Sequence, residues 1–431
     1  MTEAVEVNHH YLDRVVALSE NSGVEASEDI IAGNGMKLLA KGARIDARAK
    51  ERLLEYKLTK PLESMMRVVE GVGSRKIDRV AESLIDRHPL LSRLCGAATG
   101  KLLTTSLRDL ILTPQVDSLL SLYASQGPSK LDHAVGISLL SAAMGNEIAN
   151  GPPMDLMLMS GLLHDVGELY IDPAILSAGG AQLSPQQWKH VAAHPIVGSR
   201  VLKDMPGAGP KVAQAVLHHH ERLDGFGYPA GLRADALPMA GQVLAMAEML
   251  MGLLEAGQHH AERAEVAVKL IPGEFNRALL DKVATAAHAE SKNPKRPANG
   301  HAELESSISE LTERVTAVYG ALLRFRQHRD TIQAQLATAS APLQTLLQHA
   351  LERCHRICMA FSSTGLDSHR PEQLTAELAD LDRTVQLEVS LVLRELQWRL
   401  WELQREMALR SEQLAPGDSA VVKQFIHITT A

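Results

Sequence analysis

Histidine is unevenly distributed along this sequence. The chain has 19 histidines in 431 residues, and seven of them fall between positions 133 and 220. These seven are His133, His164, His190, His194, His218, His219 and His220. Neutral imidazole is a good ligand for Mn, Fe and Zn, and carboxylates bind the same ions. The clustering therefore indicates where metal-dependent chemistry would take place.

Two short strings carry adjacent candidate ligands. His164 and Asp165 follow an apolar run and precede Gly167, which would suit the C-terminal cap of a helix. Neighbouring helical side chains point about 100° apart, so both reach one metal only near a helix end or a cavity corner. A satisfied ion pair is the alternative interpretation of this pair alone. The pair His219 and His220 strengthens the metal interpretation, because consecutive histidines at a helix end can present both rings to one cavity.

Further segments add to this pattern. Asp224-Gly225 and Gly227-Tyr228-Pro229 predict an irregular loop, the usual place for substrate contacts. His194 precedes Pro195 at the end of a helical segment, and His133 lies in another segment of helical periodicity. Four segments that each offer imidazole or carboxylate satisfy what a multinuclear hydrolytic site requires.

These strings resemble the motifs of the HD-GYP family. They are LLHDVGELYIDPAIL (162–176), AHPIVG (193–198) and HHERLDGFGYP (219–229), in the order and spacing typical of the family. The resemblance covers roughly residues 129–283, about a third of the chain. The family is a branch of the HD-domain metal-dependent phosphohydrolases that hydrolyse the bacterial second messenger cyclic di-GMP. Its fold is an all-helical bundle around two, sometimes three, Fe or Mn ions.

The resemblance also implies roles for individual residues. The implied metal ligands are His133, His164, Asp165, His194, His219 and His220, with Asp165 bridging two ions; Glu248 is a further candidate ligand. Asp165 and Glu168 occupy the catalytic positions. The implied substrate-binding residues are Asp224, Gly225, Gly227, Tyr228 and Pro229. His190 is expected at the surface, and His218 is expected to support the ligands rather than bind metal.

The sequence departs from the family pattern at several positions. Glu168 stands where the family usually has a Lys that donates to a phosphate oxygen, so the charge is reversed. If nothing replaces that donor, transition-state stabilisation should fall by about 2–4 kcal/mol, which slows turnover roughly 30- to 1,000-fold. Glu248 and Met251 stand where the family has two Asp residues, and no basic segment follows Leu254. Ser129 replaces the Glu of trimetallic members, which favours two metals over three.

The sequence predicts a cyclic di-GMP phosphodiesterase that uses two divalent ions, Fe or Mn, and yields linear dinucleotide or GMP. The alternative is a catalytically degenerate regulator or scaffold that binds metal or nucleotide and signals through its C-terminal helices. A third interpretation is a hydrolase of another cyclic dinucleotide or nucleotide phosphate, because metals and water do not specify the base.

The elements that must position this chemistry fall into zones. Residues 1–73 are predicted to form a small β/α element, for which a regulatory role is one interpretation. It should contain a hairpin at Asn34-Gly35 and a helix that runs from its N-cap Asp46 to about Tyr56. Residues 74–290 predict the helical phosphohydrolase domain. Residues 291–300 read as a linker. In residues 301–431 apolar positions spaced near 3.5 predict long helices in a bundle or coiled coil, either intramolecular or used for a homodimer or signalling partner.

Composition bounds the remaining possibilities. Aromatic residues are 3% and hydrophobic residues 45% of the chain, which favours a mainly α fold built on Leu, Ala, Val and Met. The net charge of −7 argues against a protein that coats duplex nucleic acid. Three cysteines cannot form a disulfide framework, and Cys354 and Cys358 are expected to be packed in a core. The sequence shows neither a signal peptide nor a membrane span, and we expect a cytoplasmic protein.

Overall fold

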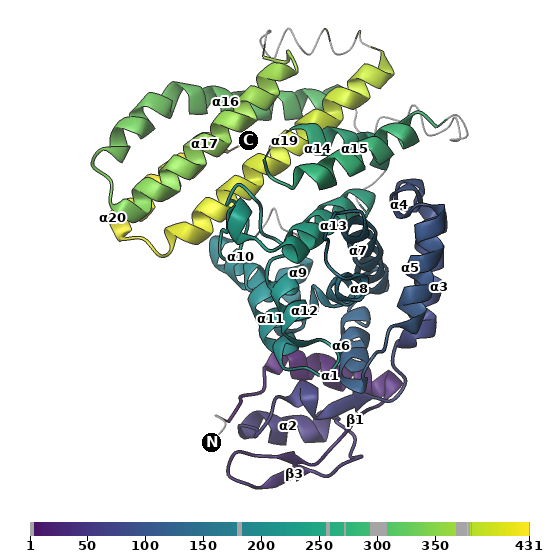
Figure 1. The fold of residues 1–431 in the computed structure, drawn as a ribbon. Helices are drawn as coiled ribbons and strands as arrows, with labels where there is room; N and C mark the ends of the chain where they lie inside the picture. Colours follow the sequence, from purple (N-terminus) through teal and green to yellow (C-terminus); the bar gives the residue numbers. More distant parts are fainter. Residues whose placement is uncertain are drawn as a thin grey trace. The chain divides into compact units, whose positions relative to one another are not determined.

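The computed structural model is helical over most of its length (Figure 1). It describes residues 4–178, 183–255, 259–270, 273–293, 308–367, 377, 380 and 382–430. The mainly α fold predicted from composition and periodicity is confirmed. Within the described residues every helix is too short or too polar to cross a bilayer.

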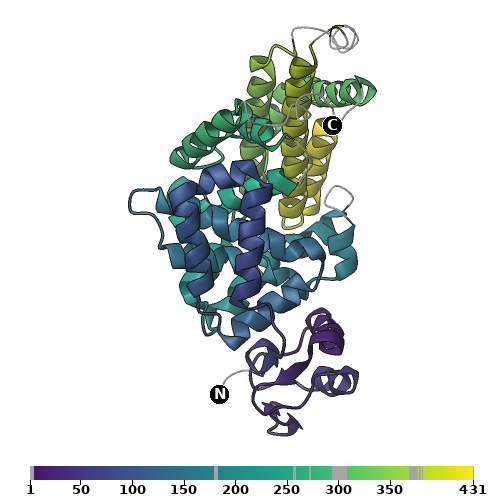
Figure 2. The same ribbon diagram turned by 90° about the vertical axis from the view of Figure 1, so that its right-hand side faces the viewer.

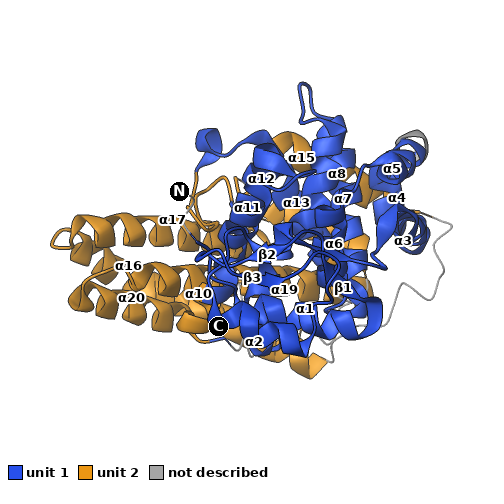
Figure 3. Ribbon diagram, turned by 90° about the horizontal axis from the view of Figure 1, so that it is seen from below, with its two compact units in different colours: residues 1–183, 190–221, 233–252 blue, residues 184–189, 222–232, 253–431 orange. Residues whose placement is uncertain are grey.

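The chain divides into two compact units (Figure 3). Unit 1 comprises residues 1–183, 190–221 and 233–252, and unit 2 comprises residues 184–189, 222–232 and 253–431. The loop 222–232 therefore belongs with the C-terminal helices rather than with the segments that flank it in sequence. The predicted boundaries follow a different division, and they stay predictions. Most of the predicted linker, 294–300, and the start of the predicted C-terminal domain, 301–307, lie outside the described residues.

The first part of unit 1 is the small β-containing element (Figure 2). Helices α1 (His9–Ser22) and α2 (Ala47–Glu55) accompany the antiparallel pairs β1 (Val24–Ala26) with β4 (Met66–Val68) and β2 (Ile30–Ile31) with β3 (Lys37–Leu39); the 3-10 turn η1 (Leu62–Ser64) precedes β4. The predicted hairpin is confirmed, with Gly35 at φ +86° between β2 and β3. The predicted cap is confirmed too, since the Asp46 side chain accepts from the backbone N–H groups of Arg48 and Ala49.

The remaining helices of unit 1 include one long buried helix, α7, against which α3, α4, α5, α6 and α8 pack. In chain order they are α3 (Gly73–Arg87), α4 (Pro89–Cys95), α5 (Ala97–Asp109), α6 (Pro114–Ala124), α7 (Pro128–Asn146), α8 (Met154–Leu163), the 3-10 turn η2 (Val166–Tyr170), α9 (Pro173–Ser177), α11 (His194–Lys203), α12 (Gly209–Leu217), η4 (Ala234–Ala236) and most of α13 (Met239–Glu255). Helix α10 (Pro185–Ala192) spans the boundary between the units. Every residue of α7 from Ala134 to Gly145 is buried, which agrees with a sequence that carries no charged residue on any side of this part of the helix.

Helices α7 and α8 pack unusually close together. A Cβ on Gly161 would lie 2.4 Å from the Cα of Ser138, so only glycine fits there. The Ser138 hydroxyl donates to the carbonyl of Leu158 at 2.8 Å, which satisfies a polar group in this apolar contact. This close packing brings the start of α7 beside the end of α8.

The N-terminal element is bound to the turn η2 by a buried arginine. Arg14 on α1 donates to the carbonyls of Leu169 at 2.8 Å and Ile171 at 3.0 Å. The Tyr11 and Tyr170 rings stack beside it with centroids 4.8 Å apart. The element therefore contacts the residues that directly follow the His164-Asp165 pair.

Unit 2 is built from long helices around a core of their own. They are α14 (His260–Leu270), α15 (Arg277–Ser291), α16 (Ile308–Leu336), α17 (Ala341–Ser363), α19 (Arg383–Ser411) and α20 (Pro416–Thr429). The predicted apolar repeat of α16 is buried, including Leu311, Val318 and Phe325. Cys354 and Cys358 are buried in the same core, as expected.

Candidate metal centre

The predicted metal ligands gather in unit 1 as two adjacent clusters. One contains Asp165, His194, His219 and His220, and the other contains His133, His164 and Glu248. Within each cluster the candidate ligand atoms all lie within 4.8 Å of one another. Every residue that the sequence predicts as a ligand lies in one of the two clusters, whereas Glu168 belongs to neither.

Most of the ligands lie at points where helices begin or end. His164 is the C-cap of α8. Asp165 follows it with φ −101° and ψ 7°, outside the regular helix, so the side chain of Asp165 is not bound to the direction that a continued helix would give it. His194 is the first residue of α11, directly after the end of α10, and His219 and His220 follow α12. His133 and Glu248 project from within α7 and α13. Helix ends bring these distant segments together without long loops.

Gly167 does not play the predicted role of helix cap. Helix α8 already ends at Leu163, and Gly167 lies in the turn η2. A Cβ at this position would lie 2.0 Å from the backbone oxygen of His194. The glycine is needed because the start of α11 approaches η2 too closely for any side chain.

Asp165 lies between two pairs of imidazoles. Its Oδ1 is 3.2 Å from His194 Nε2 and 3.5 Å from His219 Nε2. Its Oδ2 is 3.2 Å from His164 Nε2 and 3.7 Å from His133 Nε2. Each carboxylate oxygen thus faces one cluster, which is the arrangement of a carboxylate that bridges two cations.

In the pair His194 and His219, the Nε2 atoms of the two rings point toward each other. The Nδ1 atoms of His194 and His219 donate to the carbonyls of Val191 at 2.7 Å and Val216 at 2.6 Å. These bonds leave both Nε2 atoms as acceptors in the neutral rings, yet the two atoms are 3.0 Å apart. Two facing acceptors repel unless a cation or a proton lies near both. The donor set therefore fits a metal ion, with backbone carbonyls orienting its ligands.

The second cluster shows the same arrangement. His164 Nδ1 donates to the carbonyl of Gly161 at 2.8 Å, and His164 Nε2 is 3.1 Å from His133 Nε2. Glu248 Oε2 is 3.3 Å from His164 Nε2 and 3.6 Å from His133 Nε2, and among the described residues this oxygen has no hydrogen-bond partner. A buried carboxylate oxygen without a donor is a further feature that a cation would satisfy. The longer side chain of Glu248 still reaches the ligands it was predicted to join.

Burial and charge act in opposite directions on the pKa values of this centre. Burial lowers the pKa of His164, but the carboxylates of Asp165 and Glu248 outweigh burial and raise it to about 9. Burial would raise the pKa of Asp165, but the imidazoles of His164, His194 and His219 hold it well below its usual range. Burial, with the neighbouring His219 and His194, holds the pKa of His220 well below its ordinary value. Asp165 is therefore ionised and His220 neutral, the states that bind metal, whereas His164 has to release a proton to bind one.

Two residues beside the centre were missed by sequence reasoning. The buried Tyr123 hydroxyl donates to Asp165 Oδ2 at 3.1 Å. Lys130 Nζ lies 2.5 Å from Glu168 Oε2, so a cation does accompany the reversed charge at position 168. Lys130 precedes His133 by three residues on α7, and this spacing is a signal that could have revealed it. Nothing in the local sequence points to Tyr123.

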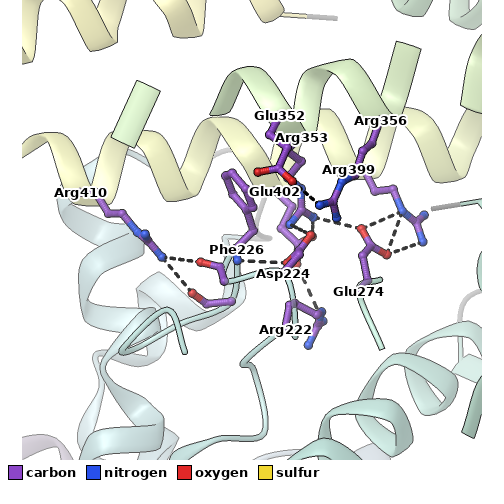
Figure 4. A network of polar contacts seen from close by, with 12 residues as sticks. Arg222, Asp224, Phe226, Glu274, Glu352, Arg353, Arg356, Arg399, Glu402 and Arg410 are labelled. Atoms are coloured by element: carbon purple, nitrogen blue, oxygen red, sulfur yellow. Dashed lines mark hydrogen bonds and ion pairs between the residues drawn. The ribbon is translucent and has the colours of Figure 1, made fainter. Parts of the chain in front are cut away.

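The predicted substrate-binding loop is bound by the C-terminal helices of unit 2 (Figure 4). Arg353 on α17 is paired with Asp224 at 3.4 Å, with Glu274 at 3.3 Å and with Glu402 at 2.6 Å. Arg410 on α19 donates to the carbonyls of Gly225 at 2.9 Å and Gly227 at 3.4 Å. The Tyr228 ring meets Trp188 edge-on with centroids 5.6 Å apart, and Pro229 follows it. Substrate contacts by these loop residues remain predictions.

The other singled-out residues have no place among the ligands. His190 is exposed, as expected, and the buried His218 lies outside both clusters. Met251 is buried against α7, where a Cβ on Gly136 would lie 2.4 Å from its sulfur. Ser129 is exposed at the start of α7.

Residues 117–281 match the model of the family described as HD domain. This stretch of the chain is therefore an HD domain, and the resemblance predicted from the motifs is confirmed. HD-domain proteins of this type are metal-dependent, which agrees with the clusters described above.

Two curated relatives and one solved structure are similar to part of this chain. The cyclic di-GMP phosphodiesterase PA4108 of Pseudomonas aeruginosa is 31% identical over 118 residues, which cover 27% of this chain and 28% of the relative. The 3'3'-cGAMP-specific phosphodiesterase 1 of Vibrio cholerae is 30% identical over 125 residues, 29% of this chain and 28% of the relative. Bd1817, an HDG"Y"P protein from Bdellovibrio bacteriovorus, shares 20% identity over 49% of this chain and 69% of its own, with a TM-score of 0.33. The chain thus spans less than a third of the length of these two curated relatives.

Proposed function

We propose that this protein is a metal-dependent phosphodiesterase that hydrolyses a cyclic dinucleotide, with cyclic di-GMP as the substrate to test first. The observation that carries the proposal is Asp165, whose two oxygens each face a separate pair of imidazoles. The names of the relatives, which act on cyclic di-GMP or 3'3'-cGAMP, support the substrate class.

The chain's own residues supply binding and orientation. Divalent ions bound at the two clusters would activate a water molecule and neutralise the nonbridging oxygens of the phosphodiester. In this proposal His194, His219 and His220 would hold one ion, His133, His164 and Glu248 would hold the other, and Asp165 would contribute to both sites. The backbone carbonyls of Val191, Val216 and Gly161 fix the rings in the tautomer that binds metal.

We propose two ions, Fe or Mn. Imidazole and carboxylate ligands without thiolate suit these metals. The two clusters supply a ligand set for each ion, and the exposed Ser129 offers no carboxylate for a third.

The decisive experiment is turnover. Purified protein loaded with Mn or Fe would be incubated with cyclic di-GMP, and linear dinucleotide and GMP would be followed by chromatography. The control is Asp165→Ala in the same loading. Product that is absent in the control supports the phosphodiesterase. A protein that has taken up both ions and forms no product would refute the proposal. A parallel reaction with 3'3'-cGAMP tests whether the protein distinguishes cyclic dinucleotides by their bases.

A regulator that signals through its C-terminal helices is the second candidate. The observation that favours it is the attachment of loop 222–232 to α17 and α19 through Arg353 and Arg410. Residues 301–431 would then form a homodimer or receive a signalling partner. Light scattering of the full chain, with and without cyclic di-GMP, tests this candidate. A protein that stays monomeric under both conditions would contradict it.

The N-terminal element is proposed to regulate the HD domain. Its buried Arg14 holds the turn η2, which follows Asp165 directly. A change in this element would therefore reach the bridging carboxylate through one short turn. Arg14→Leu should lower turnover without altering any metal ligand, and unchanged kinetics would contradict the proposed role.

A further inference from the structure

Lys130 lies at the edge of the metal centre on the same helix as a ligand. It precedes His133 by three residues on α7, and its Nζ lies 2.5 Å from Glu168 Oε2. The same Nζ is 5.0 Å from the centre of the Tyr123 ring, whose hydroxyl donates to Asp165 Oδ2. Lys130 is therefore connected to the bridging carboxylate through a single side chain.

The ammonium of Lys130 remains accessible to a ligand. The Lys130 side chain is 31% exposed and that of Glu168 is 17% exposed. An ammonium has three donors, and the bond to Glu168 uses one of them.

Arg14 is a second cation near Glu168, and its donors bind other groups. Arg14 also acts electrostatically on Glu168, but its side chain is buried. Its guanidinium donates to Gln126 and to the carbonyls of Leu169 and Ile171. Arg14 therefore holds the fold of this region, whereas the Lys130 side chain is 31% exposed.

We infer that Lys130 contacts a phosphate oxygen of the substrate and that Glu168 is a positioning residue that holds its ammonium beside the metal centre. This inference rests on the proposed phosphodiesterase function. The cation that is missing from position 168 is supplied from α7, one helical turn before His133. The reversed charge at Glu168 is then part of a working site, because it orients the lysine that replaces the missing donor.

The test separates a phosphate contact from a structural ion pair. Lys130→Met removes the ammonium. The double variant Lys130→Met with Glu168→Lys places a lysine at position 168 without restoring the ion pair. Lys50→Met is the matched control, since Lys50 forms an exposed pair with Asp13, also at 2.5 Å. Each Mn-loaded protein would be assayed for kcat and KM with cyclic di-GMP, and for binding of inorganic phosphate by calorimetry.

We expect Lys130→Met to lower kcat/KM at least ~10-fold and up to ~1,000-fold, as for the loss of one transition-state donor. Phosphate binding should weaken in the same variant while its Mn content stays unchanged, and the double variant should recover both. Lys50→Met should match the wild type.

Several outcomes would overturn the inference. They are unchanged phosphate binding in Lys130→Met, no recovery in the double variant, or no phosphate binding by the wild type. If the wild type binds phosphate through Lys130 but turns over no cyclic dinucleotide, the proposed function fails and the phosphate contact stands.

Discussion

Arg353 offers the sharpest test of how the C-terminal helices hold the loop 222–232. Its side chain is 1% exposed and meets three carboxylates, those of Asp224, Glu274 and Glu402. The guanidinium also lies 4.8 Å from the centre of the Phe226 ring. Arg353→Met keeps the apolar stem but removes the cation that these carboxylates share; Glu274 keeps Arg399 at 3.0 Å, whereas Asp224 loses the cation it is paired with. The loop would lose both its ion pair and its aromatic contact.

The expected cost is large because the network is buried. Removing one partner of a buried ion pair costs about 3–5 kcal/mol, since the remaining charge is left uncompensated. A whole domain is stable by only about 5–15 kcal/mol, so this is a substantial share. The matched control is Arg356→Met, three residues along α17, where Arg356 pairs with Glu352 at the surface. Exposed pairs of this spacing contribute about 0.3–0.5 kcal/mol.

Urea unfolding followed by circular dichroism would measure the cost, and limited proteolysis would locate it. Arg353→Met should lower the unfolding midpoint and open cleavage within residues 222–232, while Arg356→Met should do neither. Asp224→Asn should cost less than Arg353→Met, because burial raises the pKa of Asp224 and already disfavours its charge. Equal midpoints for Arg353→Met and Arg356→Met would refute the reasoning.

The remaining predictions concern the metal centre. Asp165→Asn should reduce the Mn content of both clusters together, and elemental analysis that finds one cluster still filled would contradict the bridging role. The carboxylates that outweigh burial raise the pKa of His164 to about 9, so a cation must displace its proton at neutral pH. Apparent Mn affinity, measured by titration, should therefore rise with pH by up to about tenfold per unit and level off above that pKa; a flat profile from pH 6 upward would count against this. Tyr123→Phe removes the donor to Asp165 and should weaken Mn binding about 10–100-fold, with unchanged affinity as the contrary result. Gly167→Ala places a Cβ against the backbone of His194 and should destabilise the fold by about 1–3 kcal/mol, so an unaltered melting temperature would mean that this contact can relax.

Much of this protein followed from its sequence alone. The candidate metal ligands could be named because imidazole and carboxylate types suit the chemistry and recur at fixed spacing in the motifs. Asn34-Gly35 predicted its hairpin, and Asp46 its helix, because turns and caps depend on backbone preferences within a few residues. The repeat in α16 predicted a buried face for the same local reason, since its period matches one helix.

Tertiary packing decided the features that join distant segments. The two oxygens of Asp165 face different imidazole pairs only because the ends of α8, α11 and α12 lie close to His133 within α7. Glu168 alone reads as a lost donor, but its partner Lys130 is 38 residues away in sequence. Asp224 reads as a substrate contact, while its partner Arg353 is 129 residues away. Sequence patterns report preferences within one or two turns, whereas these approaches depend on which helices pack together, and that is fixed by the shape of the whole core.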